Sequence, residues 1–498
     1  MSNQQMTSHL NQLGSEHICC AKWSDPQGFS LKRAAALAAV TLLAGCSLIP
    51  TYERPSAPVA AQWPASAGVN ATEGTSSATS SAALNWQDYF SDPALRQLID
   101  TALANNRDLR VALLNIEQAR AQFGIRRADQ FPTLDAAATG SRSPDSDGGI
   151  QSAYNAGLLV TAYELDFFGR VASLKEQALG QYLASAEAAQ TVQISLIATV
   201  AQSWLNLLAD EELLAVSRQT LDSRAESLKL VDLKVQHGAA SDFERRNAQT
   251  LLESARVTLA QQMRQRAQDE NALALLLGQP ISDTQRAQWT PNKLGQLVFA
   301  ELPAGLPSDL LTRRPDIRQA EQLLMASNAN IGAARAAFFP RISLTVGAGS
   351  ASSALSDLFK DDSWGWTLAP QLVLPIFDAG RNQANLDAAR TGREIAVAQY
   401  EKAIQSAFRE VADGLASRAT LVEQLQAQQA LLDAETARSQ LTQLRLQHGE
   451  ANQLEWLDAQ RTLFSAQQAL VQTRLASLQN QITLFKTLGG GMGAATGP

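Results

Sequence analysis

Histidine and cysteine are scarce in this chain of 498 residues. It has four His and three Cys, and all three Cys and two of the His lie within the first 46 residues. Only His237 and His448 remain for the rest of the chain. Metal clusters and thiol redox pairs need several such ligands close together, so neither kind of site is expected.

An excess of positive charge is also missing. Lys and Arg total 41 against 48 Asp and Glu, a formal net charge of −7, and this balance repels a phosphate backbone. The sequence has no HExxH, P-loop, GxSxG or paired CxxC motif, so no enzyme, cofactor or nucleic-acid partner is expected. The 45% hydrophobic content is ample for a folded core.

The N-terminus has the pattern of an export signal. Lys32 and Arg33 precede the uncharged stretch 34–45, which is too short to span a bilayer as a helix, since that needs about 20 residues. The stretch ends in Leu-Ala-Gly-Cys, which resembles a bacterial lipobox, so Cys46 is expected to be lipidated and to begin the mature chain. Residues 1–30 are unusually long for a signal start, so a start downstream of Met1 is an alternative.

Residues 46–84 are rich in Ser, Ala, Thr, Pro and Gly and have no apolar period, which predicts a flexible tether. Ser47 follows the lipidated position. If lipoprotein sorting applies, Ser rather than Asp there favours the outer membrane.

The body of the chain consists of two copies of an internal sequence repeat. Short phrases recur at an offset of 208 residues early in the repeat and of 211 residues later: Asn-Arg-Asp-Leu-Arg 106–110 with Arg-Pro-Asp-Ile-Arg 314–318, Phe-Pro 131–132 with 339–340, Gly-Arg 169–170 with 380–381, and Gln-His-Gly 236–238 with 447–449. A repeat of this length is too long for a solenoid, so it indicates duplication of a whole assembly of elements.

Proline is absent from 145–279 and from 376–497, and both stretches are rich in helix-forming residues. Each stretch predicts a pair of very long amphipathic helices that pack as coiled coils. Gly238 and Gly449 are expected to end the first helix of each pair and to turn the chain back. For His237 and His448 we prefer a capping role at the helix end over a metal or catalytic role.

The only strand-like segments lie between the helices. In 341–349 apolar and polar residues alternate, with Ile342, Leu344 and Val346 on one face, and a second alternating run contains Trp364 and Trp366. The first copy repeats this pattern more weakly. A half-buried sheet on a soluble body is one interpretation. The export signal and the length of the strands, about 10 residues each, favour strands that cross a membrane.

Strands in a bilayer must close into a barrel, and four strands from one chain cannot close. Two chains give eight strands, whose interior side chains nearly fill, whereas three give twelve. Twelve strands spaced about 4.8 Å apart and tilted near 40° enclose a backbone diameter of roughly 24 Å, which leaves an open pore.

Several phrases resemble the TolC-like outer-membrane efflux factors, in particular the lipoprotein branch that serves resistance-nodulation-division (RND) pumps. They are residues 311–321 with 328–340, Leu-Pro-Ile-Phe-Asp-Ala-Gly-Arg at 374–381, and Leu-Asp-Ala-Gln-Arg at 457–461. The resemblance implies a homotrimer with a twelve-stranded barrel in the outer membrane and a helical tunnel in the periplasm. It also implies docking to a periplasmic adaptor and an inner-membrane RND pump, for export of drugs or other toxic compounds.

We therefore expect a mainly α chain with a transmembrane β-barrel, divided into a signal peptide (1–45), a lipid-anchored flexible tether (46–84), a first repeat (85–278, with a β-hairpin at 133–166 and a helical turn at 236–241), a connector (279–308), a second repeat (309–489, with a β-hairpin at 341–377 and a helical turn at 447–452) and a flexible tail (490–498). The alternative function is a lipid-anchored periplasmic coiled-coil scaffold or adaptor without a pore. The alternating strands in both copies argue against it, since an adaptor does not need them.

The resemblance also places a gate at the periplasmic end of the tunnel, just after the second helical turn. Glu455 and Asp458 match the two constricting acids of the family and share a helix face. Leu454 and Leu457 offer an apolar seam beside them. Three chains would bring six carboxylates together, a ring that attracts cations and repels itself unless it is screened or partly protonated.

One departure from the family affects how the gate is held shut. The best-studied member has an Arg two residues after the turn glycine, and this chain has Ala451 there. The partner acid is retained as Glu244, but its neighbour is Phe243 instead of Thr. We expect closure to use other contacts, with Arg245 and Arg246 as candidates.

Overall fold

The computed structural model describes residues 47–64, 85–144, 148–290, 293–300, 302, 311 and 313–490. The expected signal peptide, Cys46 and nearly all of the expected tail lie outside these residues. Within them the elements run in the order α2 (Trp86–Tyr89), α3 (Pro93–Asn105), α4 (Arg107–Ala128), β1 (Asp135–Pro144), β2 (Ile150–Glu164), α5 (Arg170–Gln236), α6 (Asp242–Leu277), α7 (Asp283–Arg286), α9 (Pro315–Ala336), β3 (Arg341–Ser352), β4 (Trp364–Val373), α10 (Arg381–Gln447) and α11 (Gln453–Thr487).

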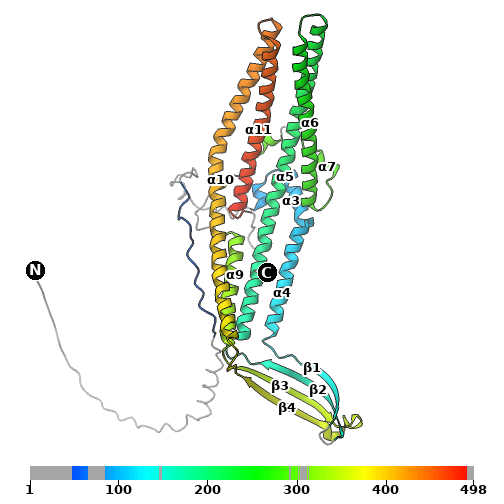
Figure 1. The fold of residues 1–498 in the computed structure, drawn as a ribbon, viewed down its shortest axis with the longest axis vertical. Coiled ribbons are helices and arrows are strands. Elements are labelled where there is room, and N and C mark those ends of the chain that lie inside the picture. Colours follow the sequence, from blue (N-terminus) through cyan, green and yellow to red (C-terminus); the bar gives the residue numbers. More distant parts are fainter. Residues whose placement is uncertain are drawn as a thin grey trace, which may run out of the picture. The chain divides into compact units, whose positions relative to one another are not determined.

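The two copies have the same plan. Each has a 22-residue helix, two strands, a 67-residue helix and a returning helix of 36 or 35 residues. Figure 1 shows the α5–α6 and α10–α11 turns at one end of the helices and the strands at the other. The mainly helical fold with four strands per chain, expected from the sequence, is confirmed.

The strands form one antiparallel sheet in the order β1-β2-β3-β4. Its register puts like residues opposite each other: Ile342 faces Leu372, and Ser343 faces Gln371. The predicted alternation of an apolar and a polar face therefore continues across neighbouring strands. Within the described residues β1 and β4 each pair with one strand only, so both outer edges of the sheet are open.

Local signals at the helical turns explain why the long helices stop where they do. Gly238 and Gly449 adopt left-handed φ values of 70° and 76°, and the following backbone N–H groups of Ala239 and Glu450 donate back to the last turn of each helix. This is the Schellman arrangement. His237 and His448 occupy the C-cap positions, where their backbone N–H groups donate into the helix.

The main core lies midway along the helices. Tyr89 stacks on Phe485 with ring centroids 4.4 Å apart, and its hydroxyl donates to the carbonyl of Gln481 at 2.9 Å. Trp204 of α5 is fully buried nearby. The helix α5 has a window apolar and long enough to cross a membrane, but most of that window is buried inside the protein. It is therefore the central core helix, and its hydrophobicity is satisfied by packing.

The expectation of a flexible tether over 46–84 is wrong for its first part. Residues 47–64, which we call the N-terminal strap, run beside α10 in Figure 1 and are bonded to α9. Asn328 donates to the carbonyl of Pro50 at 2.7 Å. Arg54 binds both carboxylate oxygens of Glu321 at 2.6 and 2.7 Å.

Further along the strap, Trp63 stacks on Phe408 of α10, with ring centroids 5.0 Å apart. The composition suggested a flexible tether, but a few specific side chains along the segment find partners on the helices. These contacts, made one residue at a time, offset the entropy of ordering the segment.

Candidate functional site

The two predicted gate acids lie on the first turns of α11, directly after the α10–α11 turn. Asn452 caps this helix by accepting from the backbone N–H of Glu455 at 2.9 Å. Glu455 and Asp458 are both roughly half-exposed. Their i,i+3 spacing places them on one face of α11.

Glu455 is held by groups on both sides of the turn. Its Oε1 accepts from Asn452 Nδ2 at 2.9 Å, and its Oε2 lies 3.8 Å from Nη1 of Arg445. Arg445, on the last turn of α10, also donates to the backbone carbonyl of Glu450 at 3.0 Å. The acid thus has a cationic neighbour from the same chain.

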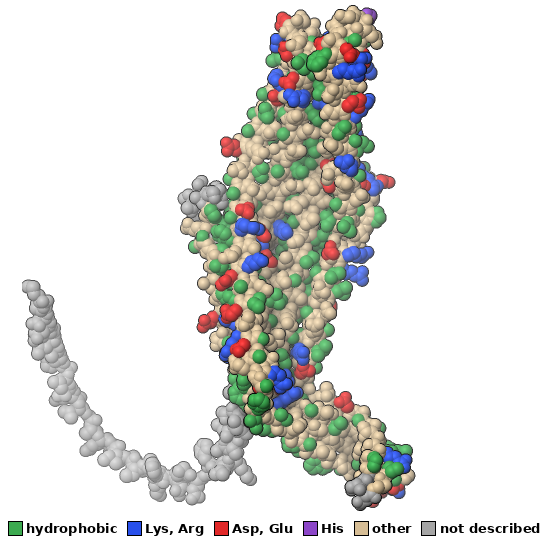
Figure 2. Space-filling view, in the orientation of Figure 1, with side chains coloured by type: hydrophobic (Ala, Val, Ile, Leu, Met, Phe, Trp, Pro, Cys, Tyr) green, Lys and Arg blue, Asp and Glu red, His purple; other side chains and the backbone are tan. Residues whose placement is uncertain are grey.

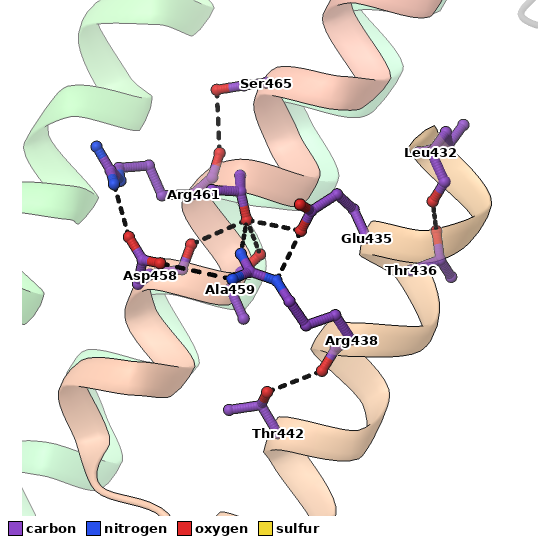
Figure 3. Close-up of polar contacts among 10 residues, drawn as sticks. Leu432, Glu435, Thr436, Arg438, Thr442, Asp458, Ala459, Arg461 and Ser465 are labelled. Atoms are coloured by element: carbon purple, nitrogen blue, oxygen red, sulfur yellow. Dashed lines mark hydrogen bonds and ion pairs between the residues drawn. The ribbon is translucent and has the colours of Figure 1, made fainter. Parts of the chain in front are cut away.

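Asp458 has two such neighbours, shown in Figure 3. Its Oδ1 lies 2.6 Å from Nη2 of Arg461, one turn further along α11. Its Oδ2 lies 3.8 Å from Nη1 of Arg438, which comes from the facing helix α10. Arg438 in turn donates through Nε to Glu435 at 2.8 Å.

Thr462 completes a closed set of contacts between the two helices. Its hydroxyl donates to Glu435 Oε2 at 2.9 Å and accepts from the Arg438 guanidinium. We call Glu435, Arg438, Asp458, Arg461 and Thr462 the α10–α11 clasp. Together with Glu455 and Arg445, these residues hold three carboxylates and three guanidinium groups, so their formal charge within one chain is zero. The sequence suggested a bare acidic ring, and the structure places an arginine beside each acid.

The two leucines that were expected to form one seam lie in different environments. Leu457 is buried, and it packs on Val231 of α5 and Ala248 of α6, where it joins the two helical pairs. Leu454 is 60% exposed. Only Leu454 is therefore free to line an opening, while Leu457 stabilises the packing behind it.

Glu244, Arg245 and Arg246 make their contacts within their own helix. Glu244 forms a capping box with Ser241, accepting its backbone N–H at 2.7 Å, and this bond lowers the pKa of Glu244. Arg245 and Arg246 both pair with Asp242. Among the described contacts none joins either arginine to α11, so the expectation that they replace the missing Arg is not supported within one chain.

Sequence reasoning missed Glu435, Arg438, Arg461 and Thr462. The position of the turn could have predicted that Arg438 and Thr462 meet, because they lie equally far along the chain from Glu450, one before it and the other after it. In antiparallel helices, residues equidistant from the turn face each other. The i,i+3 pairs Glu435–Arg438 and Asp458–Arg461 point the same way.

The sheet is the second functional region. On β4 the side chains are exposed along the whole strand, and five of them are large and apolar: Trp364, Trp366, Leu368, Leu372 and Val373. Figure 2 shows few charged side chains along the middle of the strands on the face in view, whereas charges are spread over the helices. Such an exposed apolar face is suited to contact with lipid.

Known proteins of similar sequence share this arrangement. The family described as outer membrane efflux protein matches the chain twice, over residues 98–279 and 306–490. The toluene efflux pump outer membrane protein TtgC and the antibiotic efflux pump outer membrane protein ArpC, both of Pseudomonas putida, are each 49% identical to this chain. Each alignment covers 92% of this chain and 95% of the relative.

Among solved structures, the open state of the Neisseria gonorrhoeae MtrE outer membrane channel superposes with a TM-score of 0.81 at 42% identity, covering 90% of this chain and 98% of that one. These likenesses are to channel proteins and not to adaptors, which sets aside the alternative of a scaffold without a pore. The chain belongs to the outer membrane efflux protein family, and it is an outer-membrane channel component of an efflux system.

Proposed function

We propose that three copies of this chain form the outer-membrane conduit of a tripartite efflux system, together with a periplasmic adaptor and an inner-membrane RND pump. The observation that carries the proposal is the four-stranded sheet with two open edges and an exposed apolar face. In a bilayer the unpaired backbone groups of β1 and β4 need partners, and only further copies of the same sheet supply them in closed form.

The helices support the same assembly. Apolar side chains are also exposed on the helices α4 and α10, which suits contact between copies: Val111, Leu113, Leu114, Ile125, Ile395, Val422, Leu431, Leu441 and Leu444. Three copies give twelve strands and a pore, whereas two give an eight-stranded barrel that side chains nearly fill. Chemical crosslinking with mass measurement in detergent tests this, and the detection of monomers alone would contradict it.

The cargo proposed here is small apolar or amphipathic toxic compounds, because the relatives are named for toluene and antibiotic efflux. Complementation of an efflux-deficient strain checks this directly. The chain should restore growth in the presence of toluene or a hydrophobic antibiotic when it is expressed with its cognate adaptor and pump. No restoration for any such compound would refute the cargo class and leave the channel assignment standing.

Glu455 and Asp458 are proposed as the periplasmic gate, with Leu454 beside them. Their position after the α10–α11 turn supports this role. Replacing both acids by alanine removes the side chains that narrow the opening and should raise single-channel conductance in planar bilayers. Unchanged conductance in assembled trimers would remove the gate assignment.

We also propose that Cys46 carries the lipid, and residue 47, where the strap begins, directly follows it.

A further inference from the structure

The gate acids have arginine partners in their own chain, and two of these partners, Arg438 and Arg445, come from the facing helix α10. Arg438 is the only clasp arginine on α10, and it contacts both Asp458 and Thr462 on α11. Arg461 and Asp458 share one helix, so their pair cannot hold two helices together. Any motion that separates α11 from α10 at this level must break the contacts of Arg438.

The bonding within the clasp makes Arg438 its central member. The Thr462 hydroxyl lies within donating distance of Glu435 Oε2 at 2.9 Å and of the carbonyls of Asp458 and Ala459 at 3.2 and 3.1 Å. It accepts from Arg438, because a guanidinium group can only donate. Glu435 accepts from both. Because Glu435 has only 19% of its side chain exposed, its charge needs a stable cationic partner. Arg438 is the one that the structure provides.

Arg438 also changes the charge that a passing solute meets. With Arg438 present, Asp458 lies between two guanidinium groups, at 2.6 and 3.8 Å. Without it, Glu435 and Asp458 would share the single cation Arg461 in this region, and the clasp would carry a net charge of −1 in each chain. A gate with compensated acids discriminates less against anions than a bare acidic ring.

We propose that Arg438 is a gate-positioning residue that ties α11 to α10 and sets the charge selectivity of the opening. This inference rests on the proposed gate at Glu455 and Asp458. It places this tie within one α10–α11 pair.

The experiment compares purified trimers of Arg438→Gln, Arg438→Lys and Thr462→Val in planar bilayers, with both conductance and the cation-to-anion permeability ratio recorded. Arg438→Gln should raise both. Unit charges 4 Å apart interact by about 1 kcal/mol in water, which corresponds to about a fivefold rise in the permeability ratio. Arg438→Lys keeps the charge but lacks the planar fork, so it should raise conductance and leave the ratio unchanged.

Thr462→Val leaves every charge in place and removes the hydrogen bonds that Thr462 makes with Glu435 and Arg438 across the two helices, while the Arg438–Asp458 ion pair remains. It should raise conductance without a change in selectivity, and it keeps the test decisive if Arg438→Gln does not assemble. The matched control is Arg390→Gln, an exposed arginine that pairs with Asp387 on α10 itself, about 70 Å away from Arg438 along the helix. This control should resemble the wild type in both measurements.

Wild-type conductance and selectivity in Arg438→Gln, or equal changes in Arg390→Gln, would overturn the inference. So would wild-type conductance in Thr462→Val. Failure of the gate itself is recognised separately. If replacing Glu455 and Asp458 leaves conductance unchanged, the gate assignment fails. If it raises conductance while the Arg438 and Thr462 variants behave as wild type, only the role of Arg438 is refuted.

Discussion

The strap provides the sharpest test of how this chain is held together. Arg54 places two guanidinium nitrogens on Glu321, whose side chain is only 6% exposed, while the Arg54 side chain is 49% exposed. Tyr52 donates to the same carboxylate at 3.0 Å. Replacing Arg54 by Met leaves a buried carboxylate under the docked strap without its cation, so we expect the strap to detach more often.

The magnitude follows from the burial of the two partners. Removing one partner of a fully buried pair costs about 3–5 kcal/mol, and we take about 2 kcal/mol because Arg54 is half in water. This corresponds to roughly a 30-fold larger detached population. In the comparison variant Arg335→Met, only a bond to the neutral carbonyl of Leu48 at 3.2 Å is lost. About 1 kcal/mol, or a fivefold change, is expected there.

The assay is cleavage by a glutamate-specific protease at Glu53, followed by mass measurement of the shortened chain. When the strap opens and closes faster than it is cut, the cleavage rate reports the detached population. The double variant Arg54→Met with Glu321→Met removes both charges and should return to within about threefold of the wild type. Wild-type cleavage in Arg54→Met, or additive effects in the double variant, would refute the reasoning.

Three further outcomes follow from single groups. Burial, with the nearby Asp269 adding to it, raises the pKa of Asp210 to about 8. The protonated Asp210 side chain favours the folded state fully below its ordinary pKa, and this stabilisation is lost as the pH rises toward 8. Asp210→Asn should therefore raise the melting temperature more at pH 8 than at pH 5. Arg224 is buried, donates to a backbone carbonyl at 2.8 Å and lies 5.3 Å from the Phe464 ring, and burial lowers its pKa. In calorimetry or denaturant unfolding, the free energy of unfolding of Arg224→Met should lie within about 1.5 kcal/mol of the wild-type value, whereas that of Arg224→Ala should fall by about 2–5 kcal/mol. Cys46→Ser should abolish incorporation of radiolabelled palmitate, and persistent labelling would show that the lipid is elsewhere.

The local signals in the sequence determined much of the architecture. Two proline-free stretches, each with a glycine at its turn, were enough to predict two pairs of long helices because helix propensity and C-capping are local. Period-two alternation predicted the strands for the same reason. The repeated phrases revealed the duplication without any knowledge of its shape.

The strap and the clasp were decided only by the tertiary structure. Nothing local in 47–64 distinguishes a tether from a docked segment, because the partners of Tyr52, Arg54 and Trp63 lie in the second half of the chain. The acids at 455 and 458 were found by position and resemblance, whereas their neutralisation by Arg438 depends on which faces of α10 and α11 meet. Side-chain partners across helices are set by packing, and a single sequence records that packing only indirectly.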